Sequence, residues 1–203
     1  MPIDMKRIIF VITVLTAMVS CGPTTTIEKS WRDPDVTVNT ASVHKFVVAA
    51  LLRNEAVRRS TEDQMAALYP GKAVPSYSVL GSKELTDPED VYKQRFQQQG
   101  YDGVVILRLV NVDKEQRYVP GTYPAYYGSW WGYYRYAWPT FYDPGYYTTD
   151  KTYYVEVNVY SLTRNRLIWS GITSTINPSS RDQLFGDVIK TVSKKMKQQG
   201  FVE

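Results

Sequence analysis

The chain has 203 residues, of which 43% are apolar and 22% charged, and its 24 basic and 20 acidic residues leave a formal net charge of +4. These proportions exclude a wholly disordered chain, and so small a positive charge does not indicate a nucleic-acid partner. One cysteine and one histidine exclude an intramolecular disulfide and a Cys/His zinc cluster, so we expect no metal and no cofactor.

The first 20 residues have the form of a secretory signal peptide. The basic pair Lys6-Arg7 precedes an apolar run over 8–19. This run is shorter than the roughly 20 residues that a membrane-spanning helix needs. We therefore predict a signal peptide over 1–20.

The segment Ala17-Met18-Val19-Ser20-Cys21 resembles the bacterial lipobox. The resemblance implies that Cys21 becomes the acylated first residue of the mature protein, anchored in the membrane by its lipid. Gly22 is not the aspartate that keeps many such lipoproteins on the inner membrane, which implies a periplasm-facing anchor in the outer membrane. Several acyl chains make a durable anchor, because each buried methylene contributes about 0.8 kcal/mol. A signal peptide cut near Ser20 and an uncleaved anchor are the alternatives.

Apolar patterning predicts one folded domain over 43–203, preceded by a tether over 21–42 that has no long periodic run. The expected order is β-α-β-α-β-β-β-α, an α/β fold with a mixed sheet. In chain order we expect a strand over 43–52, a helix over 54–69, a strand over 73–80, a helix from 86–90 to Gly100, a strand over 104–110, a hairpin over 152–162 and 167–176, and a final helix capped by Ser180.

This order of elements, the lipobox and the hairpin sequence Tyr160–Gly171 resemble a group of bacterial envelope lipoproteins. The group includes the curli-secretion channel subunit and the lipoprotein activators of penicillin-binding proteins, and its shared domain is similar to the amino-terminal domain of TolB. The resemblance implies a non-enzymatic role in anchoring, assembly or partner contact. No catalytic motif or defined binding residue comes with it.

Residues 117–154 form an aromatic-rich insertion between the third and fourth expected strands. They hold 12 of the 17 tyrosines, three tryptophans, four glycines and four prolines. Tyrosine and tryptophan join an apolar ring to a polar group and suit contacts with proteins, glycans and membrane interfaces. A loosely packed low-complexity insertion is the alternative. The candidate contact surface consists of Tyr126, Tyr127, Trp130, Trp131, Tyr133, Tyr134 and Trp138.

Three acidic groups could supply the paired carboxylates of a glycan hydrolase: Asp33/Asp35, Glu62/Asp63 and Glu84/Asp87/Glu89/Asp90. We expect the second to lie on a solvated, charge-paired helix face and the third to begin a helix. His44 is expected to be a structural or surface residue rather than part of a nucleophilic triad. Four lysines near the end of the last helix suit the helix dipole, with contact to anionic headgroups as a second hypothesis: Lys190, Lys194, Lys195 and Lys197.

These features predict a lipid-anchored, non-catalytic envelope lipoprotein that acts as an interaction or assembly module, with an envelope protein or glycan as its partner. A cell-wall glycan hydrolase that uses paired carboxylates is one alternative. A secretion-pore subunit is another, although Pro120, Pro124, Pro139 and Pro144 interrupt every candidate membrane-spanning strand in the insertion. The oligomeric state is left open.

Overall fold

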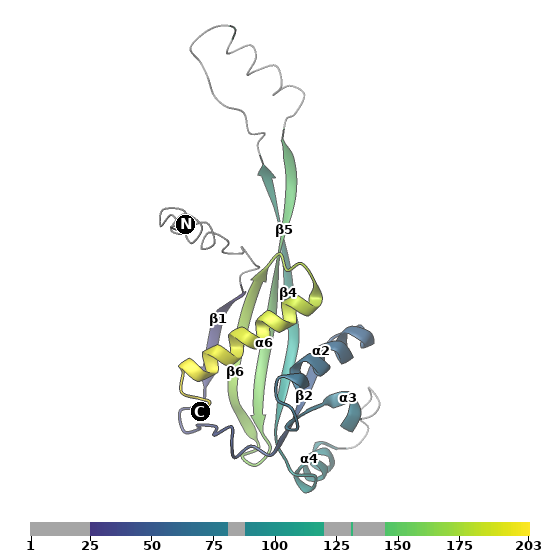
Figure 1. Cartoon of the computed structure of the whole chain (residues 1–203), viewed down its shortest axis with the longest axis vertical. Coiled ribbons are helices and arrows are strands. Elements are labelled where there is room, and N and C mark those ends of the chain that lie inside the picture. Colours follow the sequence, from purple (N-terminus) through teal and green to yellow (C-terminus); the bar gives the residue numbers. More distant parts are fainter. Residues whose placement is uncertain (1–24, 81–87, 120–130, 132–144) are drawn as a thin grey trace, which may run out of the picture.

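The computed structural model describes residues 25–80, 88–119, 131 and 145–203, which build a six-stranded mixed sheet with helices (Figure 1). This confirms the predicted α/β class. The strands run in the order β1-β6-β5-β4-β2-β3 across the sheet. They are β1 (Thr25–Arg32), β2 (Lys45–Leu51), β3 (Ala73–Pro75), β4 (Tyr101–Val119), β5 (Tyr146–Ser161) and β6 (Arg166–Ile176), and the helices are α2 (Glu55–Ala67), α3 (Ser76–Val79), α4 (Glu89–Gln98) and α6 (Arg181–Gln198).

The sheet has a parallel part and an antiparallel part. Strands β3, β2 and β4 are parallel, whereas β4, β5, β6 and β1 are antiparallel to their neighbours. The chain moves outward from β2 to β3 through α2 and then back past β2 to β4 through α4. Because both crossovers are expected to be right-handed, this reversal requires α2 and α4 to cover opposite faces.

Two apolar clusters lie on the two faces of the sheet. The larger cluster joins strand residues such as Val48, Leu107 and Val157 to buried residues of α2 and α6, among them Met65 and Val188. Helix α6 crosses this face of the sheet (Figure 1). On the other face Val47, Phe96 and Tyr101 form the smaller cluster, in which the Phe96 and Tyr101 rings meet edge to face at 5.4 Å.

The long helices begin at side-chain caps. Asn54 Oδ1 accepts a hydrogen bond from Val57 N at 3.1 Å at the start of α2. At the start of α6 the predicted cap is confirmed, since Ser180 Oγ accepts from Gln183 N at 3.1 Å. The Gln183 side chain reaches back to Ser179 N at 3.2 Å, one residue before the expected partner. Both caps satisfy amides that the first helical turn leaves unpaired.

The expected tether over 21–42 is wrong for its described part, because residues 25–32 are strand β1 at the edge of the sheet. Hydroxyl groups join β1 to β6, with Thr25 Oγ1 2.8 Å from Thr175 Oγ1 and Thr26 Oγ1 2.9 Å from Ser174 Oγ. Val36, farther along, is 4% exposed in the core. An edge strand held by hydroxyl pairs needs no apolar alternation, so its pattern resembles that of a linker.

The expected strand over 73–80 is wrong beyond Pro75, where the chain turns into the short helix α3. Proline has no amide hydrogen to donate to a sheet, which favours a strand end at this residue. Two other strands are longer than predicted: β4 extends to Val119 and β5 begins at Tyr146. Both ends of the expected insertion are therefore strand.

Candidate functional site

Beyond the end of β6, strands β4 and β5 continue alone as a two-stranded ribbon, which we call the stem. Ile176, the last residue of β6, pairs with Thr152 of β5, so the stem comprises 114–119 and 146–151. Figure 1 shows that the ribbon leaves the body of the sheet. Six residues at about 3.3 Å each carry it roughly 20 Å outward.

Asn177 fixes the base of the stem. Its side-chain Oδ1 accepts from Lys151 N at 2.8 Å, and its side-chain Nδ2 donates to Asp150 Oδ1 at 2.8 Å. Its backbone N donates to Lys151 O at 2.9 Å. Asn177 has a φ of +47°, a left-handed conformation that asparagine tolerates better than most residues. One residue thus ties the end of β6 to β5 at the point where the stem begins.

The two faces of the stem differ in chemistry. On one face Lys114 lies opposite Lys151, and Tyr118 lies opposite Tyr147 with ring centroids 5.3 Å apart. We call these four residues the basic-aromatic face. On the other face Glu115 lies opposite Asp150.

An ion pair reduces the repulsion between like charges on only one of these two faces. Asp150 Oδ2 lies 3.5 Å from Arg117 Nε. Within the described part of the chain, neither Lys114 nor Lys151 has an ion-pair partner. Like charges directly opposite one another destabilise a strand pair. The repulsion between Lys114 and Lys151 therefore opposes stem formation, and an anionic group bound beside them would offset that repulsion.

Aromatic side chains continue to the end of the stem. Tyr146 is 65% exposed and Tyr147 73% exposed, and neither was among the predicted contact residues. The sequence feature that could have indicated them is their position within the aromatic-rich residues 117–154. The stem ends at Gly145, whose φ is +89° and where an added Cβ would lie 2.5 Å from Val119 O. Glycine is the residue that fits this close approach.

Of the seven predicted contact residues, the described part of the chain contains Trp131, which is 53% exposed. The expected signal peptide and the predicted lipidation residue Cys21 also lie outside the described residues. Among the helices that are described, none has the length and apolar character to cross a membrane. The other six predicted contact residues lie outside the described ranges: Tyr126, Tyr127, Trp130, Tyr133, Tyr134 and Trp138.

The expectation of a solvated Glu62 is wrong, because its side chain is fully buried. Its Oε1 accepts from Ala50 N at 3.0 Å and Ser76 Oγ at 2.8 Å, and its Oε2 accepts from Tyr77 N at 3.2 Å. Strand β3 ends opposite Val48, so no strand partner reaches the Ala50 amide on that side of β2. Glu62 replaces that partner and joins α2, β2 and α3.

Two other candidate acids also have structural partners. Asp33 is 4% exposed and lies 2.6 Å from Arg166 Nη2 through its Oδ2. Asp63 accepts a hydrogen bond from the Tyr77 hydroxyl at 2.6 Å. That bond is the main cause of a raised Tyr77 pKa. Asp33 follows β1 and Asp63 lies on α2, and each is engaged by its own partner, an arginine or a tyrosine.

His44 is a surface residue, as expected, with 83% of its side chain exposed and Nδ1 3.5 Å from Asp102 Oδ2. Glu89 and Asp90 lie in the first turn of α4, as expected, whereas Glu84 and Asp87 lie outside the described residues. Across 25–80, 88–119, 131 and 145–203, no three His, Cys, Asp or Glu side chains gather where they could hold a metal ion.

A pocket of about 380 Å³ lies between the sheet and helix α6. Its deep walls are apolar and include Val48, Leu107, Val157, Ile168 and Val192. This volume falls in the range of about 300–1,000 Å³ that is typical of small-molecule sites. The sequence predicted no such site, because its walls come from six separate elements.

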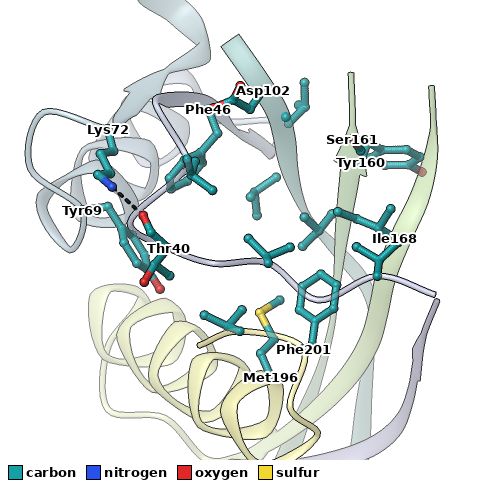
Figure 2. Close-up of a pocket in the computed structure, with 18 of the residues that line it drawn as sticks. Thr40, Phe46, Tyr69, Lys72, Asp102, Tyr160, Ser161, Ile168, Met196 and Phe201 are labelled. Atoms are coloured by element: carbon teal, nitrogen blue, oxygen red, sulfur yellow. Dashed lines mark hydrogen bonds between the residues drawn. The ribbon is translucent and has the colours of Figure 1, made fainter. Parts of the chain in front are cut away.

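The segment 36–43, which we call the strap, crosses the pocket (Figure 2). The carboxyl end of the chain holds it: Val38 N donates to Phe201 O at 2.7 Å, and Thr40 Oγ1 donates to Glu203 O at 2.7 Å. Lys72 Nζ donates to Thr40 O at 2.5 Å. Figure 2 shows Lys72, Thr40 and Tyr69 together on one side of the pocket, which gives it a polar rim there.

No protein-family model and no curated protein sequence matches the chain. Among solved structures, the chain is similar to the PelC dodecamer from Paraburkholderia phytofirmans, with a TM-score of 0.42 and 11% identity over 84% of this chain and 96% of that chain. It is also similar to lipoprotein GNA1162 from Neisseria meningitidis, with a TM-score of 0.40 and 12% identity over 76% of this chain and 98% of that chain. One of these structural neighbours is a lipoprotein, the broad class of protein that the sequence resembles.

Proposed function

We propose that the protein is a lipid-anchored, non-catalytic lipoprotein of the bacterial envelope that uses its stem and the aromatic residues between its strands to contact an envelope partner. The observation that carries the proposal is the stem itself. A ribbon about 20 Å long contributes little to the apolar core, because its residues are mostly polar and exposed. Its two lysines, which have no ion-pair partner within the described ranges, and its exposed tyrosines instead suit a contact surface.

The chemistry of the basic-aromatic face indicates the kind of partner. Lys114 and Lys151 favour a partner that carries carboxylate or phosphate groups, and Tyr118 and Tyr147 add apolar contact with a hydroxyl group at its edge. An acidic envelope protein meets both requirements. An acidic glycan is the alternative, and chemical identification of the captured partner separates the two.

Site-specific crosslinking in intact cells tests this contact. A photoreactive amino acid at position 147 should capture a partner, whereas one at Leu68, which is 55% exposed at the end of α2 and outside the stem, should not. Lys114→Glu combined with Lys151→Glu should reduce capture by at least tenfold. Glu115→Lys reverses a charge on the other stem face and should leave capture unchanged. Equal capture from positions 147 and 68 would remove the stem as the contact site.

The anchor needs a separate experiment. A fatty-acid probe should label the full chain and fail to label Cys21→Ala, because acylation of Cys21 is the proposed attachment. Unlabelled wild-type protein would refute the anchor and leave the stem contact standing.

A deletion tests the aromatic residues between the two strands of the stem. Removal of residues 120–144 should abolish capture without loss of the sheet. Because a hairpin turn needs at least two residues, we expect the Val119–Tyr146 pair to open and form the turn, while the sheet pairs closer to the body remain intact.

A further inference from the structure

We propose that the strap pocket binds a single fatty acyl chain that carries an anionic head group. The pocket lies under the strap, on the helical side of β5, and is separate from the stem. The proposal therefore goes beyond the partner contact proposed above and does not depend on it.

The walls of the pocket select for a hydrocarbon. Val105, Val159 and Met196 face it as partly buried residues, and Leu107 and Val192 close it from the core. A volume of about 380 Å³ corresponds to about a dozen groups the size of a water molecule, at roughly 30 Å³ each. Water needs two to four polar partners at a buried site, and these deep walls supply apolar groups instead. A linear chain of about twelve carbons matches both the volume and the lining.

The rim of the pocket selects for a negative charge. Lys72 has no ion-pair partner among the described residues and uses one of its three ammonium hydrogens for Thr40 O. The Tyr69 hydroxyl lies 3.3 Å from Ser193 Oγ on the same rim. Together they present an ammonium group and two hydroxyl groups where a carboxylate or phosphate could be held. Asp102, the acid on the rim, accepts a hydrogen bond from the His44 amide at 2.5 Å.

The strap explains how a chain could enter. Its fastenings are a few hydrogen bonds to Phe201, Glu203 and Lys72, and several of these are exposed. Val36 is buried in the core and Val38 packs against it, so the part of the strap around Thr40 is the part that can release. Exposed hydrogen bonds belong to the least stable parts of a fold. Release of Thr40 from Glu203 and Lys72 would open the rim of the pocket without separating α6 from the sheet.

The test measures binding of radiolabelled dodecanoate to the full chain after exchange into an amphipathic polymer that replaces free detergent. We expect saturable binding of one dodecanoate per chain. Val159→Phe fills the pocket and should weaken binding by at least tenfold. Ile172→Phe is the matched control, because Ile172 pairs with Glu156 and lies on the other face of the sheet. It should change binding by less than twofold. Should Val159→Phe fail to fold, Ser193→Trp blocks the rim from α6 and should have the same effect.

A second comparison tests the head group. Lys72→Met should weaken dodecanoate binding by about fivefold to tenfold and leave dodecanol binding within twofold. Displacement of the label by dodecanoyl lysophosphatidylglycerol more readily than by unlabelled dodecanoate would assign the site to a lysophospholipid, and the reverse order would assign it to a free fatty acid. Absence of saturable binding, or equal loss in Val159→Phe and Ile172→Phe, would overturn the site. Equal loss of dodecanoate and dodecanol in Lys72→Met would overturn the anionic head group.

Discussion

Replacement of Glu62 by alanine should be strongly destabilising, because it removes the acceptor that joins three elements of the fold. Three donors, Ala50 N, Ser76 Oγ and Tyr77 N, would lose their partner at a side chain that is fully buried. Each buried group left unsatisfied costs about 1–3 kcal/mol, so the loss of the partner of all three donors should cost about 3–9 kcal/mol. Since a whole domain is stable by only about 5–15 kcal/mol, this loss would leave the fold marginal.

Glutamine at the same position provides the sharper comparison. One amide oxygen of Glu62→Gln can still accept from Ala50 N and Ser76 Oγ, but the amide nitrogen would then face Tyr77 N, which is also a donor. The expected cost is about 1–3 kcal/mol, between those of wild type and Glu62→Ala. Chemical denaturation of the full chain measures both values, with the exposed Glu89→Gln expected within about 1 kcal/mol of wild type. A Glu62→Ala value as small as that of Glu89→Gln would refute the bridging role.

Other predictions concern the stem, the core and alkaline pH. Asn177→Ala should loosen the stem more than Asn177→Gly, because both lose the side-chain bonds to β5 but alanine is also strained at a φ of +47°; hydrogen exchange of the backbone amide at position 177, which donates to Lys151 O, measures the difference. Gly171→Ala should cost about 1–3 kcal/mol in chemical denaturation, because its Cβ would lie 2.4 Å from the buried Trp169 ring. The hydrogen bond to Asp63 raises the pKa of Tyr77 above 10.0, so the unfolded chain loses the tyrosine proton at a lower pH than the folded chain does. The free energy of unfolding should therefore fall as the pH rises past 10.0, and Tyr77→Phe should make its decline between pH 9 and 11.5 shallower.

The elements that the sequence predicts well are those whose cause is local. The run around Val47 and Val48 is buried on both faces of β2, as a continuous apolar run indicates. Helix α6 follows from a cap at Ser180 and an apolar stripe that includes Leu184 and Val188. In each case the residues that decide the structure lie within one or two turns, or one strand, of each other.

The features that the sequence does not predict depend on partners far along the chain. The polar stem is stable as strand because residues such as Lys114 and Lys151, 37 positions apart, share a register that the apolar parts of β4 and β5 set. Glu62 resembles a surface helix residue until the position at which β3 ends leaves the Ala50 amide without a strand partner. Neither the stem nor the buried role of Glu62 appears as a periodic pattern in the sequence.

Strand β5 connects the two proposed sites and also allows them to be tested separately. Its first residues, Tyr146–Lys151, belong to the stem, and the residues from Val157 to Ser161 lie along the pocket. The intervening residues 152–156 are paired on both sides, with β4 and with β6, so this part of the strand is held rigidly. Charge reversal at Lys151 should therefore reduce partner capture and leave dodecanoate binding unchanged, whereas Val159→Phe should do the opposite. A variant that impairs both would indicate damage to the sheet itself rather than to either site.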